Sequence, residues 1–254
     1  MSDEVLVERR GSVQVITINR PEARNAINGA VAAGVRDAVD ELDADGALQV
    51  GVLTGAGGTF SSGMDLKAFL KGETPSFPGR GLAGITQTPP RKPMIAAAEG
   101  YALAGGFELA MACDLVVAGT SAKFGVPEVK RSLVAGAGGA LLLARRIPRA
   151  LALEMLLTGD PFGAQRAFDI GLVNRVVEDG QALDAALELA ARIAANGPLA
   201  LMATKEISNG GADWSAEERW DQMARIMAPV FTSQDAQEGA RAFAEKRAPV
   251  WKGQ

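Results

Sequence analysis

The sequence predicts an α/β protein with a largely parallel sheet, and three features of its pattern indicate this. Residues 13–19 alternate as a strand does, and apolar residues then recur at helical spacing from Val31 to Leu42. A strand, a glycine loop and a helix follow one another over 50–70 and again over 93–113. Because repeated βα units build parallel sheets, we expect this chain to form one.

The elements expected in these repeats are short and apolar. They are, in chain order, a strand at 50–54, a helix at 64–70, a strand at 93–98, a helix at 107–113 and a strand at 115–118. Between the two repeats, residues 72–93 hold five prolines and four glycines, a composition that disfavours regular structure. We expect this stretch to be a mobile surface segment that covers a site.

The pattern changes towards the end of the chain. Residues 181–195 have strong helical character, Gly197-Pro198 interrupts it, and the remainder predicts further helices. We therefore divide the chain into a core at 1–195 and a C-terminal helical region at 196–254.

Composition excludes several classes of function. With 254 residues, 48% of them hydrophobic, the chain can bury a large core, and its formal charge of −4 offers no cationic surface for a nucleic acid or an anionic membrane. No apolar run is long enough to cross a bilayer, and the acidic, mixed N-terminus predicts no targeting peptide, so we expect a cytoplasmic protein. With no histidine and Cys113 as the single cysteine, neither a disulfide within the chain nor a metal site is expected. Chemistry is left to carboxylates, backbone groups or a cofactor.

Glu108 is the first candidate for catalysis. It lies in the apolar run Gly-Gly-Phe-Glu-Leu-Ala-Met-Ala, where a buried carboxylate is costly unless it is paired or used. Burial would raise its pKa towards the range that suits a general acid or base. A solvated position on an amphipathic helix is the alternative, which spacing alone leaves open.

Glycines point to a second feature of a site. The helices expected after Gly63 and Gly105 begin with N–H groups that have no partner within the helix, and glycine allows close approach. If the two helix starts converge, the N–H groups of Met64 and Gly105 form a cradle for a carbonyl oxygen that becomes negative during a reaction. Two ordinary tight turns are the alternative.

Several motifs, in order along nearly the whole chain, resemble the enoyl-CoA hydratase/isomerase (crotonase) family. They are Asn19-Arg20-Pro21, Leu53-Thr54-Gly55, Phe60-Ser61-Ser62-Gly63-Met64-Asp65-Leu66, Lys92-Pro93-Met94-Ile95-Ala96-Ala97, Gly100-Tyr101-Ala102-Leu103-Ala104-Gly105-Gly106-Phe107-Glu108-Leu109-Ala110, Cys113-Asp114, Phe124-Gly125-Val126-Pro127-Glu128, Gly136-Ala137-Gly138-Gly139 and Leu157-Thr158-Gly159. The resemblance implies a spiral of ββα units and a C-terminal helical region that packs between subunits of a trimer or a dimer of trimers.

The resemblance also implies a function, an enoyl-CoA hydratase acting on an acyl-CoA substrate, with no cofactor beyond the coenzyme A of the substrate. Met64 and Gly105 would form the oxyanion hole, and Glu108 and Glu128 would hold a water between them. Glu108 would activate this water for attack on the β-carbon, and Glu128 would protonate the α-carbon. The Gly136 N–H would help to position the water.

Residues that bind coenzyme A are expected in two places. The resemblance places the adenine end against the backbone near Met64 to Leu66, with Asp65 between them. The phosphates need local cations on this acidic chain, and the candidates are Arg24, Lys67 and, in the C-terminal tail, Lys246. A plain surface charge is the alternative for each.

This chain departs from the family pattern around the proposed site. Ala104 stands at the usual third glycine, Phe107 at a position often filled by a smaller residue, and Ser132 and Ala135 replace a common glycine and proline. Lys130-Arg131 next to Glu128 would lower the pKa of that carboxyl if these cations faced it; facing solvent is the alternative.

Three functions are compatible with this sequence. The first is hydration of a 2-enoyl-CoA. The second is another crotonase reaction, such as isomerisation, carnitinyl-CoA-type dehydration or thioester hydrolysis; the presence of both glutamates argues against a simple isomerase. The third is an RNA-binding protein of the same fold, which the low isoelectric point and the absence of a basic stripe disfavour.

Overall fold

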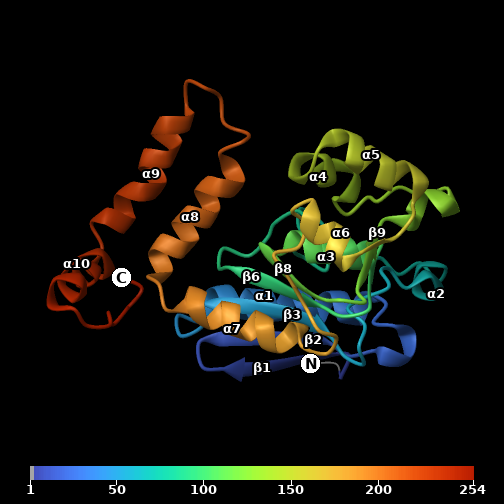
Figure 1. Ribbon diagram of the computed structural model, residues 1–254, viewed down its shortest axis with the longest axis horizontal. Helices are drawn as coiled ribbons and strands as arrows, with labels where there is room; N and C mark the ends of the chain where they lie inside the picture. Colours follow the sequence, from blue (N-terminus) through green and yellow to red (C-terminus); the bar gives the residue numbers. More distant parts are fainter. Residues whose placement is uncertain (1–2) are drawn as a thin grey trace.

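A six-stranded sheet lies at the centre of the protein in the computed structural model, which describes residues 3–254 (Figure 1). The strand order is β1-β2-β3-β6-β8-β11; β1 and β2 are antiparallel, and the other neighbours are parallel. The strands are β1 (Val5–Arg10), β2 (Val13–Ile18), β3 (Val50–Gly55), β6 (Met94–Ala98), β8 (Leu115–Gly119) and β11 (Arg175–Val177). The predicted parallel sheet is confirmed.

Ten α-helices and two short 3-10 helices are described in residues 3–254. They are η1 (Pro21–Ala23), α1 (Gly29–Ala44), α2 (Leu66–Phe69), α3 (Gly105–Ala112), η2 (Pro127–Arg131), α4 (Gly139–Arg146), α5 (Arg149–Thr158), α6 (Ala164–Asp169), α7 (Ala182–Ala194), α8 (Pro198–Gly210), α9 (Arg219–Phe231) and α10 (Gln234–Glu245). Two helix starts differ from expectation, and the first is that of α3, which begins at Gly105 rather than Phe107. The helix expected from Met64 begins at Leu66 because the Asp65 side chain caps it, accepting from the Lys67 and Ala68 N–H groups.

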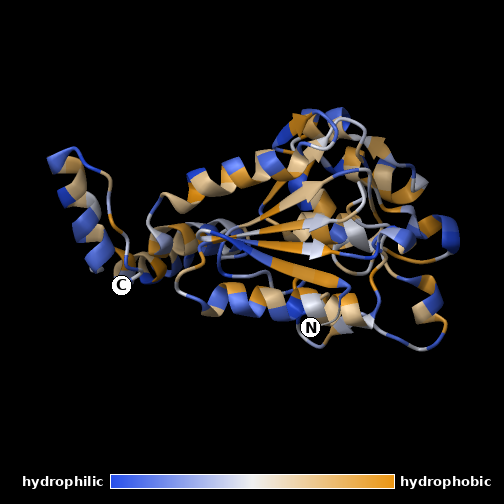
Figure 2. Ribbon diagram, turned by 90° about the horizontal axis from the view of Figure 1, so that it is seen from below, coloured by the Kyte–Doolittle hydropathy of each residue, from blue (hydrophilic) through white to orange (hydrophobic). Residues whose placement is uncertain are grey.

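The two faces of the sheet are covered by different helices. On one face, Val50, Val52 and Ile95 pack with the alanine stripe of α7. On the other face, Leu53 and Ala96 belong to the larger cluster that includes α1 and α3. Burial on both sides explains why the central strands are apolar throughout, as Figure 2 shows.

A second sheet, of three strands, is built from the same repeated units as the first. It contains β7 (Tyr101–Leu103), β9 (Lys123–Gly125) and β10 (Phe162–Gly163) in the order β10-β9-β7. β6 is followed by β7 and α3, and β8 is followed by β9 and η2, so successive units send one strand to each sheet. Ser61 takes the corresponding place in the first unit, where it forms a parallel bridge with Ala102. This is the ββα spiral that the resemblance implies.

The segment 72–93 is largely irregular, as its composition predicts, but residues 81–86 are buried rather than at the surface; its mobility stays a prediction. It contains a small hairpin, β4 (Ser76–Phe77) and β5 (Gly81–Leu82), and it buries Leu82, Ala83 and Ile85 in the main core. Glycines here take left-handed conformations that wind the chain tightly, rather than leaving it loose. The predicted surface position was wrong for this part, because composition reports backbone preference and says nothing about tertiary partners.

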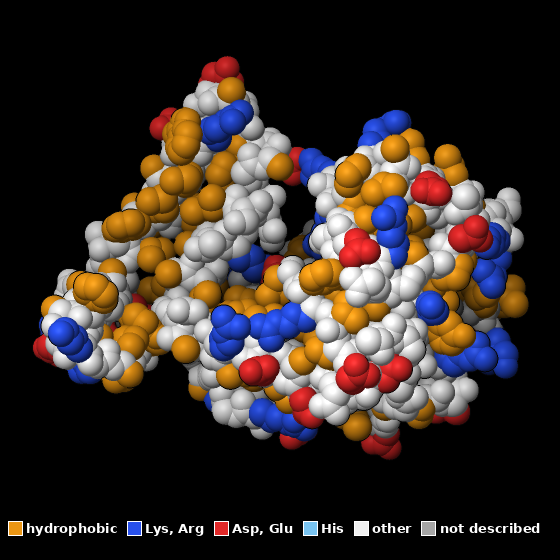
Figure 3. Space-filling model, in the orientation of Figure 1, with side chains coloured by type: hydrophobic (Ala, Val, Ile, Leu, Met, Phe, Trp, Pro, Cys, Tyr) orange, Lys and Arg blue, Asp and Glu red, His pale blue; other side chains and the backbone are white. Residues whose placement is uncertain are grey.

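Helices α8, α9 and α10 form an arm that projects from the body (Figure 1). No residue of α8 or α9 is buried, and Trp220, Phe231 and Phe243 on the arm are 68%, 72% and 88% exposed. Figure 3 shows a band of hydrophobic side chains along α9. The arm leaves the body at the break before Pro198; the division of the chain near residue 196 stays a prediction.

A partly buried ion pair anchors helix α8 of the arm to the body. The Lys205 ammonium on α8 donates to the Asp114 carboxylate at 2.7 Å and to the Lys92 carbonyl at 2.9 Å. The side chains of Lys205 and Asp114 are only 9% and 24% exposed. The same Asp114 oxygen also accepts from the Met94 N–H at 2.7 Å. Because Asp114 follows α3 directly and Met94 opens β6, this pair ties the arm to the centre of the body.

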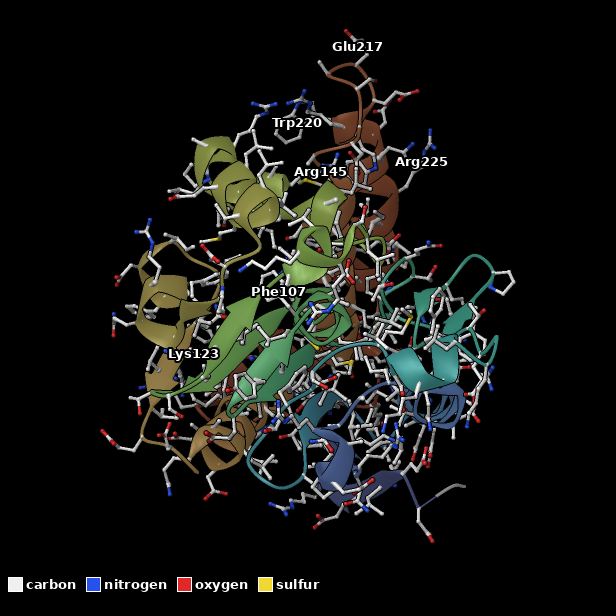
Figure 4. All side chains as sticks on the ribbon, turned by 90° about the vertical axis from the view of Figure 1, so that its right-hand side faces the viewer. Phe107, Lys123, Arg145, Glu217, Trp220 and Arg225 are labelled. Carbon is white, nitrogen blue, oxygen red and sulfur yellow. The ribbon has the colours of Figure 1, made fainter. Side chains whose placement is uncertain are left out.

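Two further contacts hold the arm at its ends. The Arg145 guanidinium on α4 pairs with Asp213 in the turn between α8 and α9, and Figure 4 shows Arg145 beside the arm. At the base, the Trp251 indole N–H donates to the Ala195 carbonyl at 2.8 Å. The arm is therefore held at three places.

Replacing Lys205 with methionine should weaken the fold. The substitution leaves the partly buried Asp114 carboxylate without its cation, which we expect to lower the free energy of unfolding by about 2 kcal/mol. Denaturant titration measures this loss. Glu206→Gln, at the exposed neighbouring position on α8, is the control and should change stability by less than about 0.5 kcal/mol. Equal effects of the two variants would contradict the anchoring role of Lys205.

Candidate active site

Two backbone N–H groups converge at the start of α3. A β-carbon at Gly105 would lie 3.5 Å from the Met64 nitrogen, and a β-carbon at Gly63 would lie 3.0 Å from the Gly105 nitrogen. Within residues 3–254, neither the Met64 nor the Gly105 N–H has a backbone or side-chain acceptor. These two donors are therefore adjacent and free, as an oxyanion hole requires.

The segment that carries Met64 is fixed from both sides. Ile27 donates to the Gly63 carbonyl at 2.8 Å, and Asp65 donates to the Ile27 carbonyl at 2.9 Å. The Gly63 N–H donates to the Ser61 hydroxyl, which in turn donates to the Asn25 carbonyl. Because Gly63 has a φ of +94°, a side chain there would strain the backbone as well as crowd Gly105.

Glu108 is buried in the first turn of α3, only 5% exposed. Its Oε1 accepts from the Gly139 N–H at 2.8 Å, at the start of α4. Burial raises the pKa of Glu108 to about 7; the hydrogen bonds from the Gly139 and Ala137 N–H groups oppose this rise, and the negative charge of Glu128 adds to it. A carboxyl with such a pKa exchanges protons readily near neutral pH.

Glu128 lies on η2 with one carboxylate oxygen, Oε2, buried and without a hydrogen-bond partner. Burial raises the pKa of Glu128 too, against the opposing effects of its own backbone N–H and of Arg131. The charge of Glu128 raises the pKa of Glu108, so the two carboxyl groups are close enough for their ionisation to be coupled. The unpartnered oxygen leaves Glu128 free to bind a water or a substrate atom.

The cations beside Glu128 do not face it equally. The Lys130 ammonium binds the Asp160 carboxylate, and Arg131 is exposed to solvent. The Arg131 charge lowers the pKa of Glu128, but the effect of burial is larger. Glu128 therefore keeps the raised pKa that a proton donor needs.

Gly139 is the residue of this site that sequence reasoning missed. The prediction gave the water-positioning role to Gly136, which lies exposed in the loop between η2 and α4, and that role stays a prediction. In the sequence, the glycine-rich cluster Gly136-Ala137-Gly138-Gly139 was the feature that could have pointed to Gly139. A β-carbon at Gly139 would lie 3.1 Å from Glu108 Oε1, so only glycine fits easily.

The residues predicted to bind coenzyme A fall into two groups. Arg24 lies beside the cradle, since its carbonyl accepts from Ser62 and its guanidinium lies 5.9 Å from the centre of the Tyr101 ring. Leu66 and Lys67 begin α2, with Leu66 43% exposed. These residues share the surface next to Met64.

Asp65 and Lys246 have other surroundings. Burial acts to raise the pKa of Asp65, but hydrogen bonds from the Ala68 N–H, the Arg20 guanidinium and the Lys67 N–H together lower it. The Asp65 carboxylate therefore stays charged as the cap of α2. Lys246 ends α10, at the opposite end of the molecule from α2 in Figure 1. Within one chain, the structure does not bring Lys246 to the cradle.

Among residues 3–254, no group of three His, Cys, Asp or Glu side chains is arranged to hold a metal ion. None of the described helices has the length and apolar character to cross a membrane.

Residues 8–254 match the enoyl-CoA hydratase/isomerase family, and the chain belongs to this family. It is similar to the enoyl-CoA hydratase EchA19 of Mycobacterium tuberculosis, with 45% identity over 97% of this chain and 95% of the relative. It is also similar to a carnitinyl-CoA dehydratase of Proteus mirabilis, with 42% identity over the whole of both chains.

Solved structures extend this similarity to the fold. An enoyl-CoA hydratase from Mycobacterium tuberculosis superposes with a TM-score of 0.98 at 57% identity, and a carnitinyl-CoA hydratase from Mycobacterium avium with 0.80 at 48%, each over all of both chains. The expected family and the crotonase fold are thus confirmed, and the chain is a member of an enzyme family whose relatives are named for adding or removing water.

The raised pKa of Glu108 predicts a pH-dependent cost to stability. Glutamate in an unfolded chain has a pKa of about 4.3, so ionising Glu108 costs the folded state up to about 3 kcal/mol above pH 7. The wild type loses this stability as pH rises from about 4.3 to about 7. Glu108→Gln cannot ionise, so we expect it to melt higher than the wild type at pH 8 and at a similar temperature near pH 4.5.

Thermal denaturation of both proteins at the two pH values measures this difference. Glu206→Gln serves again as the control for a glutamate outside the site, with little effect at either pH. A Glu108→Gln variant that is less stable than the wild type at pH 8 would contradict the assignment of a costly buried charge.

Proposed function

We propose that this chain is an enoyl-CoA hydratase that reversibly adds water across the 2,3 double bond of a 2-enoyl-CoA thioester. One observation carries the proposal: two carboxyl groups with raised pKa, Glu108 and Glu128, lie in one site next to two free N–H donors. The names of the hydratase relatives support it.

The N–H groups of Met64 and Gly105 bind the thioester carbonyl oxygen. Water attack on the β-carbon moves electrons towards this oxygen, and the negative charge that develops strengthens both hydrogen bonds. Each such donor lowers the barrier by about 3 kcal/mol. Helix α3 begins at Gly105, so the positive end of its dipole also stabilises negative charge on the carbonyl oxygen.

The two glutamates divide the proton transfers. Ionised Glu108 accepts a proton from the water as its oxygen bonds to the β-carbon, and protonated Glu128 delivers a proton to the α-carbon. The pair starts and ends with one shared proton, so the total charge of the site does not change. Repulsion between two close carboxylates favours this singly protonated state. The chemistry needs no cofactor, because coenzyme A is part of the substrate.

Dehydration of a 3-hydroxyacyl-CoA of the carnitinyl type is the second candidate. The similarity to carnitinyl-CoA dehydratases over the whole chain favours it. The same two carboxyl groups would then work in the reverse direction. Substrate preference, rather than a different set of catalytic groups, separates the two candidates.

Hydration can be observed directly. The purified protein should bleach the absorbance of the conjugated thioester in but-2-enoyl-CoA, whereas full retention of this absorbance with 2-enoyl thioesters of every length tested would remove the hydratase proposal. A panel that includes carnitinyl-CoA distinguishes the second candidate.

Glu108→Gln and Glu128→Gln should each lower kcat by at least about 100-fold, because each variant lacks one proton-transfer group. Binding of a saturated acyl-CoA should change little, since glutamine has nearly the same shape. Steady-state kinetics and calorimetry measure the two effects. Turnover at the wild-type rate in either variant would show that the pair is wrongly assigned.

We also propose that the arm assembles the chain into a trimer or a dimer of trimers. The exposed apolar side chains of α9 and the unburied state of α8 support association through the arm. In such an assembly Lys246 could reach the coenzyme A site of a neighbouring subunit. Light scattering should give the mass of a trimer or hexamer, and a monomer at micromolar concentration would contradict the proposal.

A further inference from the structure

One apolar side chain, Leu82, lies directly against the oxyanion hole. A β-carbon at Gly105 would lie 2.8 Å from Leu82 Cδ2 and 3.5 Å from the Met64 nitrogen, so Leu82 packs against the residue that supplies one of the two donors. The Leu82 methyl group therefore lies near a carbonyl oxygen bound by both N–H groups.

Leu82 is held in this place by its own turn. Its backbone N–H donates to the Thr86 hydroxyl at 3.0 Å, and the Ile85 N–H donates back to the Leu82 carbonyl at 3.2 Å. Gly81 and Ala83 on either side have φ of +73° and +50°, so the backbone is tightly wound. The Leu82 side chain is 5% exposed.

Helix α1 fixes this turn from outside. The Arg80 guanidinium binds the Asp40 carboxylate of α1 through two nitrogens and donates to the Gly84 carbonyl at 3.0 Å. The Arg36 side chain packs against Gly84, and its guanidinium lies 4.2 Å from the centre of the Phe77 ring. Because the turn is held on both sides, Leu82 cannot move aside easily for a larger ligand.

We propose that Leu82 is a specificity-determining residue that restricts the site to acyl groups without a branch on the carbon next to the thioester carbonyl. This inference rests on the proposed function. A methyl branch on that carbon projects into the space beside the carbonyl, which the Leu82 side chain fills. Acyl groups that are unbranched there leave this space to Leu82.

The ratio of kcat/KM for 2-methylbut-2-enoyl-CoA to that for but-2-enoyl-CoA tests the proposal. The wild type should favour the unbranched substrate. Leu82→Ala should raise the ratio by at least about 10-fold, because discrimination by one methyl group in an apolar pocket is of that size. Leu82→Met, which nearly conserves volume, should leave the ratio near the wild-type value. An unchanged ratio in Leu82→Ala would overturn the proposal.

Leu48→Ala is the matched control. Leu48 is as buried as Leu82 but precedes β3, at the opposite end of this strand from the cradle. The control should lose stability and keep the wild-type ratio, and a ratio that rises equally in Leu48→Ala would show a general effect of core truncation and overturn the proposal.

Binding separates this inference from the proposed function. Calorimetry with butanoyl-CoA and 2-methylbutanoyl-CoA gives the same comparison without turnover, and Leu82→Ala should bind the branched thioester relatively more tightly, by at least about 10-fold. Absence of turnover with such a shift would refute hydratase activity and keep the role of Leu82. Turnover of the unbranched substrate, with no change in relative binding of the branched thioester in Leu82→Ala, would support hydratase activity and refute the role of Leu82.

Discussion

The hydrogen bond from the Gly139 N–H to Glu108 is the interaction on which the site depends. A carboxylate on the fully buried helix α3 loses its hydration, and without a polar partner that loss would be prohibitive. The start of α4 supplies the partner, together with the favourable end of a helix dipole. Helices α3 and α4 must therefore pack closely, and Gly139 cannot carry a large side chain.

The remaining parts of the site follow from how α3 is placed. Its first residue supplies one donor of the cradle, so the loop after β3 must bring Met64 to the same point, and Asn25, Ser61 and Gly63 fix that loop. Leu82 packs against Gly105 at this point. The arm takes no part in these contacts within one chain, which leaves its apolar surface free for association.

Sequence reasoning succeeded where local pattern and tertiary structure agree. The strands expected at 50–54, 93–98 and 115–118 form within one residue of expectation, because burial on both faces gives them continuous apolar runs. Within 72–93, the buried position of 81–86 was missed, because it depends on Arg36, Asp40 and Arg80 contacts that no local pattern shows. For the site, burial alone drew attention to Glu108, whereas Glu128 depended on the family resemblance. Gly139 acts through its backbone, and sequence carries little signal for such a role.

The ionisation of Glu108 is coupled to that of Glu128. Glu108 has two backbone N–H groups that stabilise its charge, so it can ionise near neutral pH despite its burial. Burial also raises the pKa of Glu128, and the charge of Glu128 adds to the rise in the pKa of Glu108. Once one carboxyl is charged, repulsion keeps the other protonated. Both raised pKa values allow the pair to share one proton near neutral pH, as the proposed hydration requires.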